Sequence, residues 1–132
     1  MKNKVIIAVN IIIINKDKKV LIAKRPADKP MPNKWEFPGG KLEENESLEE
    51  CGLREIKEEL ELDVIIDKYL GYDELTYKGQ DFLLHIYTAH KADENQILKL
   101  NEHTDSKWVD VNELNNFDMP AKDLKFTKLI FS

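Results

Sequence analysis

The chain has 132 residues, of which 42% are hydrophobic and 34% are charged. This length predicts one globular domain, residues 1–132, with a real core and no room for a second domain. The net charge of -5 excludes the overall basic field that long nucleic acids need. The only cysteine is Cys51, so no disulfide can form within the chain, and a reducing, cytoplasmic location is expected.

The first apolar run, residues 5–14, predicts a strand and not a membrane segment. Its β-branched residues fill both alternating faces, which indicates a central strand covered on both sides. Asn10 interrupts the run, which is too short to span a bilayer. Residues 15–18 indicate a hairpin turn into a second strand at 19–25, so we expect no membrane partner.

A loop and a helix follow. Residues 26–38 hold four of the five prolines and predict a loop that leads into the pair Gly39-Gly40. Ser47 and Glu50 form a capping box that starts a helix. Gly52 in mid-helix indicates close approach to a strand. Four apolar residues of this helix are expected to face the sheet: Leu48, Leu53, Ile56 and Leu60.

The rest of the chain completes an alternation of strands and helices. Residues 64–77 and 82–90 predict further strands, and residues 108–109 a short one. Residues 111–114 and 121–130 predict helices. The elements together predict an α/β fold in which helices sandwich a mixed β-sheet.

The predicted helix carries an acidic stripe. Glu55, Glu58 and Glu59 stand at i, i+3 and i+4, which places their side chains on one helical face. These like charges repel one another, and a hard cation such as Mg²⁺, which prefers oxygen ligands, would turn the repulsion into binding. Because a solvated surface helix can carry the same stripe, the surrounding residues have to decide.

Those residues follow a fixed pattern in which Gly40 is followed after five residues by Glu46, and Glu46 after seven by Arg54. The full set is Gly40, Glu46, Arg54, Glu55, Ile56, Glu58, Glu59 and Leu62. It resembles the box of the Nudix hydrolases at every position but one, and a chance match is on the order of one in a hundred thousand. Residues 25–28 and 31–41 are similar to the MutT-type branch of this family.

The one departure is Glu61, where the family pattern has glycine. Glycine there would be the left-handed residue that ends the helix, and a side chain in that conformation costs about 1 kcal/mol. The departure concerns the helix exit and leaves the carboxylates untouched.

The resemblance implies a Nudix-type α/β/α sandwich that binds Mg²⁺ or Mn²⁺ and hydrolyses a nucleoside diphosphate linked to another group. Arg54 would orient the carboxylates, although an ordinary surface ion pair is the alternative. Glu55, Glu58 and Glu102 all stay open as the general base. The implied metal ligands are the Gly39 carbonyl, Glu55, Glu58, Glu59 and Glu102.

Substrate contacts are expected from both polar and aromatic residues. Arg25 and Lys41 are candidates for phosphates or sugar, with simple solvent exposure as the alternative for Lys41. Asp123 would contact the base edge or else be the acid at the start of the last helix. Phe37 and Phe82 could sandwich the base or belong to the core.

The three histidines lack metal-ligand spacing and are expected to be incidental: His85, His90 and His103.

The resemblance favours a nucleotide-pool sanitising enzyme that converts 8-oxo-dGTP to monophosphate and pyrophosphate. A CTP or modified dCTP pyrophosphohydrolase is the rival within the class, and Tyr77 keeps dinucleoside polyphosphates open. A catalytically silent Nudix module that binds nucleotide is the alternative of another class, but such modules typically lose a box glutamate, and here none is missing. We expect a monomer or weak dimer.

Overall fold

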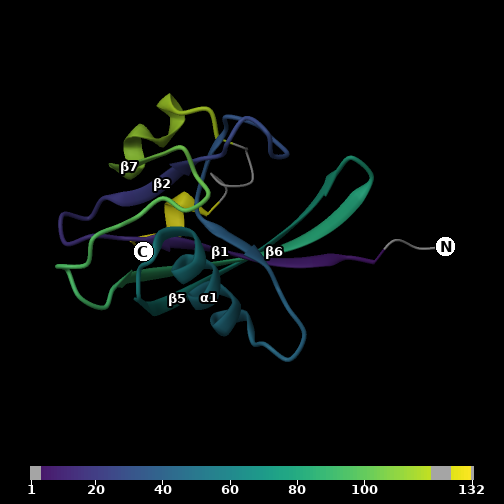
Figure 1. Ribbon diagram of the computed structural model, residues 1–132, viewed down its shortest axis with the longest axis horizontal. Helices are drawn as coiled ribbons and strands as arrows, with labels where there is room; N and C mark the ends of the chain where they lie inside the picture. Colours follow the sequence, from purple (N-terminus) through teal and green to yellow (C-terminus); the bar gives the residue numbers. More distant parts are fainter. Residues whose placement is uncertain (1–3, 120–125, 132) are drawn as a thin grey trace.

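The computed structural model describes residues 4–119 and 126–131, and these form two sheets (Figure 1). The larger sheet has the strand order β4-β1-β6-β5, and the smaller one the order β3-β2-β7. The strands are β1 (Ile6–Ile13), β2 (Val20–Lys24), β3 (Trp35–Glu36), β4 (Gly39–Lys41), β5 (Val64–Tyr77), β6 (Gln80–Lys91) and β7 (Asp105–Val109). The helical elements are α1 (Leu48–Leu60) and the 3₁₀ helices η1 (Val111–Asn116) and η2 (Thr127–Leu129).

Strand β1 is central, as its sequence predicts. It pairs parallel with β6 and antiparallel with β4, which makes the sheet mixed. Val9 and Ile11 pack into the core cluster that contains α1, whereas Ile12 packs into a second cluster with β2, β6 and η1. Both faces of β1 are therefore covered, and the expected α/β sandwich is confirmed.

The two predicted C-terminal helices differ from what is observed. Residues 111–116 form a 3₁₀ helix, because Val and Asn are weak helix formers and Asp110 provides no side-chain cap. Of the predicted helix at 121–130, residues 121–125 lie outside the described part of the chain. The remainder contains the single 3₁₀ turn η2.

Helix α1 begins as predicted. Ser47 Oγ accepts a hydrogen bond from the Glu50 N–H at 3.0 Å, and Glu50 Oε1 accepts one from the Ser47 N–H at 2.8 Å. A Cβ atom at Gly52 would lie 2.6 Å from Ile11 Cδ1, so the expected close approach of helix and strand is confirmed. The prediction for Leu53 is wrong, since it is 38% exposed at the edge of the buried stripe.

The helix ends at Glu61 in the left-handed conformation, with φ 55° and ψ 36°. Its N–H still donates to the Lys57 carbonyl at 3.0 Å. The usual helix exit is thus kept without glycine, and the Cβ of Glu61 bears the strain.

We predict that Glu61→Gly raises the free energy of unfolding by about 0.5–1 kcal/mol, because relief of the left-handed strain exceeds the added chain entropy of glycine. Urea denaturation measures the change. Glu61→Ala is the matched control, since it removes the carboxylate but keeps the strained Cβ. Equal stability of the two variants would contradict this account.

Candidate active site

The predicted metal-binding face of α1 lies where three segments meet: α1 itself, the turn at β4, and residues 99–104 before β7. The last segment is attached to the end of the helix by its backbone. The Lys99 N–H donates to the Leu60 carbonyl at 3.0 Å, and the Asn101 N–H donates to the Glu59 carbonyl at 3.0 Å. These bonds satisfy carbonyls that a helix end leaves free, and they bring Glu102 next to the acidic face.

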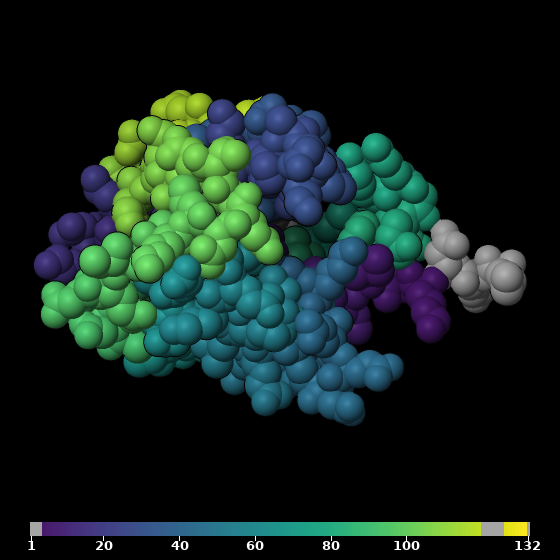
Figure 2. Space-filling view, in the orientation of Figure 1, coloured from purple at the N-terminus to yellow at the C-terminus, as the bar shows by residue number. Residues whose placement is uncertain are grey.

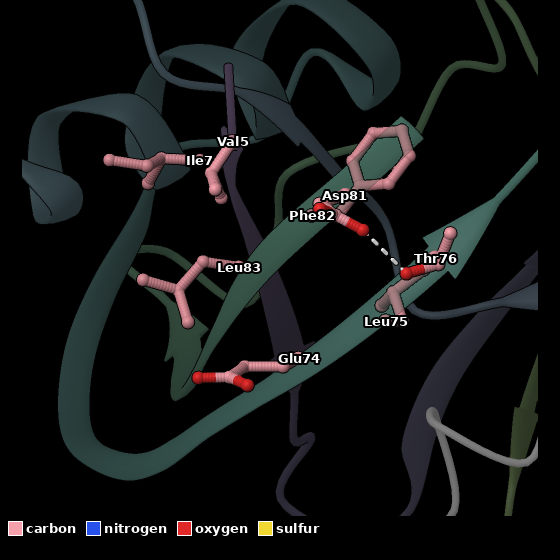
Figure 3. Close-up of a pocket in the computed structure, with 8 residues that line it drawn as sticks. All are labelled: Val5, Ile7, Glu74, Leu75, Thr76, Asp81, Phe82 and Leu83. Atoms are coloured by element: carbon pink, nitrogen blue, oxygen red, sulfur yellow. Dashed lines mark hydrogen bonds between the residues drawn. The ribbon is translucent and has the colours of Figure 1, made fainter. Parts of the chain in front are cut away.

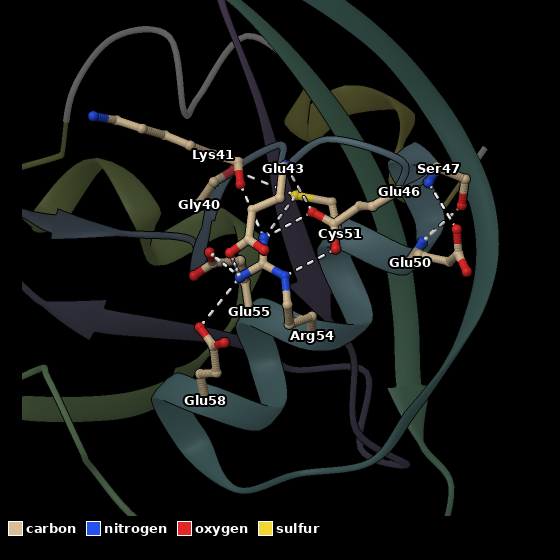
Figure 4. Close-up of polar contacts among 10 residues, drawn as sticks. All are labelled: Gly40, Lys41, Glu43, Glu46, Ser47, Glu50, Cys51, Arg54, Glu55 and Glu58. Carbon is tan, nitrogen blue, oxygen red and sulfur yellow. Dashed lines mark hydrogen bonds and ion pairs between the residues drawn. The ribbon is translucent and has the colours of Figure 1, made fainter.

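Arg54 organises this face (Figure 4). Its guanidinium binds Glu46 with two hydrogen bonds, Nε to Oε2 at 2.9 Å and Nη2 to Oε1 at 2.8 Å. Nη1 donates to Glu55 at 2.8 Å and to Glu58 at 3.2 Å, and Nη2 also donates to the Lys41 carbonyl at 3.0 Å. One side chain thereby joins the glycine turn to the carboxylates, which is the geometry that a positioning role requires.

The electrostatics of this cluster follow from the same contacts. Hydrogen bonds from the Arg54 side chain and the Glu43 backbone lower the pKa of Glu46 to about 2, so Glu46 remains ionised. Burial raises the pKa of the Cys51 thiol to about 12, and the charge of Glu46 adds to this shift. Cys51 therefore stays protonated, and a protonated thiol is a poor nucleophile.

We predict that Arg54→Lys lowers the free energy of unfolding by about 2 kcal/mol, because an ammonium cannot reproduce the two-pronged bond to Glu46. Urea denaturation measures this loss. Lys57→Gln is the matched control on the same helix, since Lys57 makes one exposed ion pair with Asp63 at 3.2 Å. Lys57→Gln should change the free energy of unfolding by less than about 0.5 kcal/mol. A similar loss in both variants would contradict a special role of the two hydrogen bonds between Arg54 and Glu46.

The glycine turn lies in contact with this cluster. Gly39 and Gly40 belong to β4 and pair with Asn10 and Val9 of β1, respectively. A Cβ atom at Gly40 would overlap the Glu55 carboxylate, and one at Gly39 would overlap the backbone of β1. Glycine is therefore required at both positions, because it allows the carboxylate and the neighbouring strand to approach the turn.

Glu59 is the most unusual carboxylate of the cluster. It is 2% exposed, and within residues 4–119 and 126–131 its Oε2 atom has no hydrogen-bond partner. Burial raises the pKa of Glu59 far above the ordinary carboxyl range, and the charges of Glu55, Glu36 and Glu102 raise it further. A buried oxygen without a partner, facing other carboxylates, fits a divalent cation, whose binding would displace the proton.

We predict that Glu59→Gln changes how stability depends on pH in EDTA. Because the folded-state pKa of Glu59 is raised, its contribution to stability is complete below the ordinary carboxyl pKa and is lost as pH rises above it. The glutamine side chain of the variant does not titrate. Wild type and variant should therefore melt alike at about pH 5, and the variant should be the more stable at about pH 9. Thermal melting measures the difference in stability between wild type and variant. If this difference does not grow with pH, Glu59 does not hold a proton in the folded protein.

Two further residues of this site were missed at the sequence level. His103 Nε2 lies 2.9 Å from Glu36 Oε2 and 3.7 Å from Glu59 Oε1. The expectation that all histidines are incidental is thus wrong for His103, although His85 and His90 make separate contacts on β6. The spacing of residues gave no signal here, because Glu36, Glu59 and His103 lie far apart in sequence. The position of His103 directly after Glu102 was the available signal.

A cavity of about 330 Å³ adjoins the glycine turn. Three predicted substrate residues line it, namely Arg25, Lys41 and Phe82, together with Glu36. Figure 2 shows the surface hollowed between the blue segment before β4 and the green β5–β6 hairpin. The structure therefore gathers these side chains, distant in sequence, around one pocket of a size suited to part of a nucleotide.

One predicted substrate residue, Phe37, lies elsewhere. Phe37 is 1% exposed and belongs to the core cluster of Ile12 and Leu84, so sandwiching of a base by Phe37 is corrected to core packing. The reason is the alternation of side chains around the short strand β3, which turns Phe37 inward. Asp123 lies outside the described residues.

A second cavity, of about 670 Å³, lies along the β5–β6 hairpin (Figure 3). Its charged lining residues are Glu74 and Asp81, and Asp81 accepts a hydrogen bond from the Thr76 hydroxyl at 2.6 Å. Acidic side chains repel phosphates, so this larger cavity is a poorer candidate for a phosphorylated ligand than the pocket beside the glycine turn.

The α/β sandwich and its acidic turn-and-helix site define the class of the protein, and comparison with known families identifies it. The NUDIX domain family model matches residues 4–130. The chain therefore belongs to the Nudix family, hydrolases that act on phosphoanhydride bonds, and the expected MutT-type resemblance is confirmed.

Named relatives agree with this assignment. The chain is 30% identical over 112 residues to the CTP pyrophosphohydrolase of Escherichia coli (strain K12). This match covers 85% of this chain and 82% of that protein. It is 49% identical over 63 residues to the 8-oxo-dGTP diphosphatase of Proteus vulgaris. This match covers 48% of this chain and 55% of that protein.

Solved structures share the fold. The MutT protein from Methanosarcina mazei Go1 superposes with a TM-score of 0.86 at 23% identity, over 98% of this chain and 94% of that one. The E. coli ORF135 protein gives a TM-score of 0.79 at 30% identity, over 96% of this chain and 88% of that one. None of the helices in the described part of the chain has the length and apolar character needed to cross a membrane.

Proposed function

We propose that residues 1–132 form a single Nudix domain that hydrolyses nucleoside triphosphates to monophosphate and pyrophosphate in the cytoplasm with Mg²⁺ or Mn²⁺. The observation that carries this proposal is the buried Glu59 carboxylate, whose Oε2 atom has no hydrogen-bond partner among the described residues. It lies on the same helix as Glu55 and Glu58, which Arg54 orients.

In this mechanism the chain's own residues bind the divalent ion, orient its ligands and deprotonate the attacking water. Glu55, Glu58, Glu59 and Glu102, with the Gly39 carbonyl, are the proposed ligands of the divalent ion. When bound, this ion neutralises phosphoryl oxygens and lowers the pKa of bound water. Glu55, Glu58 or Glu102 accepts the proton of the attacking water.

The pocket beside the turn is the proposed place of the nucleoside. Arg25 and Lys41 line it and would pair with phosphate or sugar oxygens, since both carry hydrogen-bond donors with positive charge. Phe82 supplies an aromatic face for the base. Asp123 is proposed to accept hydrogen bonds from the base edge, because an ionised carboxylate accepts without donating.

8-oxo-dGTP is the substrate that we propose first. The support is the similarity to several proteins named 8-oxo-dGTP diphosphatase, at 49% identity for the Proteus vulgaris protein over its matched part. CTP or a modified dCTP is the second candidate. It is favoured by the match to the CTP pyrophosphohydrolase of Escherichia coli, which extends over 85% of this chain.

Pyrophosphate release from a panel of triphosphates tests the proposal. With Mg²⁺ present, we expect kcat/KM for 8-oxo-dGTP to exceed that for dGTP by about 10²-fold, and EDTA to abolish turnover. Preference for CTP or a modified dCTP would select the second candidate. Tight binding of nucleotide without any turnover would instead favour a catalytically silent module.

Glu58→Gln should lower kcat by about 10²-fold or more without unfolding the protein, because the side chain is 54% exposed and serves as a metal ligand in this proposal. Circular dichroism checks the fold. Glu49→Gln is the matched control, an exposed glutamate in the first turn of α1, and it should keep wild-type kcat. Full activity of Glu58→Gln would show that the site is misassigned.

A further inference from the structure

His103 lies at the junction of the pocket and the proposed metal site. Its side chain is 3% exposed, and its Nε2 atom lies 2.9 Å from Glu36 Oε2. The same nitrogen is 3.7 Å from Glu59 Oε1, which is beyond a hydrogen bond but within close electrostatic contact. One ring nitrogen therefore faces both carboxylates, and in the tautomer that carries hydrogen on Nε2 it donates to Glu36.

Glu36 continues the connection into the pocket. Its other oxygen, Oε1, accepts a hydrogen bond from Arg25 Nη1 at 3.0 Å. Arg25 and Glu36 both line the 330 Å³ cavity, whereas Glu59 belongs to the acidic face of α1. A continuous series of polar contacts thus runs from Arg25 through Glu36 and His103 to Glu59.

The backbone around His103 is fixed on both sides. The Asn101 N–H donates to the Glu59 carbonyl, and the Thr104 N–H donates to the Lys24 carbonyl, each at 3.0 Å. One bond attaches the segment to the end of α1 and the other to the end of β2. Because these anchors belong to a helix and a strand of the scaffold, the imidazole holds a defined position between the two carboxylates.

We propose that His103 is a positioning residue that sets the geometry of Glu36 in the nucleotide pocket and of Glu59 at the metal ion. The proposal rests on the function proposed above. Groups that hold a metal ligand in place without binding the metal typically change affinity or activity by 10–100-fold when they are removed. Without the imidazole, no donor would lie between Glu36 and Glu59, and once a metal ion had displaced the proton of Glu59, repulsion between the two carboxylates would shift both.

The test compares two substitutions at position 103. His103→Gln keeps an N–H donor near the place of Nε2, whereas His103→Leu keeps apolar volume and removes the donor. Mn²⁺ affinity is measured by electron paramagnetic resonance of the free ion, and kcat and KM are measured with the preferred triphosphate. His90→Gln is the matched control, because His90 of β6 forms a solvent-exposed pair with Asp67 of β5, away from the proposed site.

We expect His103→Leu to weaken Mn²⁺ binding and to lower kcat by about 10-fold or more, with His103→Gln within about threefold of wild type in both. His90→Gln should match wild type. Equal Mn²⁺ affinity in wild type and His103→Leu, or equal losses in the Leu and Gln variants, would overturn the proposal. A directly coordinated imidazole nitrogen in the electron spin echo spectrum of wild type would also overturn it, because His103 would then be a ligand.

The same measurements separate the two proposals. A wild-type protein that neither binds Mn²⁺ nor releases pyrophosphate contradicts the proposed function. A wild-type protein that does both, combined with an unaltered His103→Leu variant, contradicts only the positioning role.

Discussion

Carboxylates gathered in one place repel one another, and in this protein the Arg54 guanidinium counters that repulsion. Its two parallel bonds to Glu46 fix the plane of the guanidinium, so the remaining N–H groups are aimed at Glu55 and Glu58. Of the three glutamates on the helix face, Arg54 contacts Glu55 and Glu58, whereas Glu59 is the most buried of the three. The protein's own cation thus neutralises one side of the cluster, and on the other side the proposed divalent ion would replace the proton of Glu59.

The position of this cluster depends on two close backbone approaches. Gly52 lets α1 pack directly on Ile11 of β1, and Gly40 leaves room for the Glu55 carboxylate against β4. Strand β1 then separates helix and pocket by simple alternation. Val9 and Ile11 pack in the core cluster of α1, while Ala8 and Asn10 line the cavity. The proposed metal site and the pocket are therefore placed relative to each other by strand β1.

Local patterns in the sequence predicted much of this arrangement. The capping box at Ser47 located the start of α1, and the β-branched run located β1, because both signals depend on neighbours within a few residues. The prediction for β5, residues 64–77, matches its observed bounds. Where competing local preferences were weak, as in residues 111–116, a 3₁₀ helix formed in place of the predicted helix.

The sequence by itself determined the chemistry of the acidic face, since i, i+3 and i+4 spacing places Glu55, Glu58 and Glu59 together on any helix. Only the tertiary structure decided which of these glutamates is buried and that Phe37 belongs to the core. It also decided that His103 lies between Glu36 and Glu59. The physical reason is that burial and long-range contacts arise when separate segments pack. Glu36 and His103 are separated by 67 positions in the sequence, and no periodic signal joins residues so far apart.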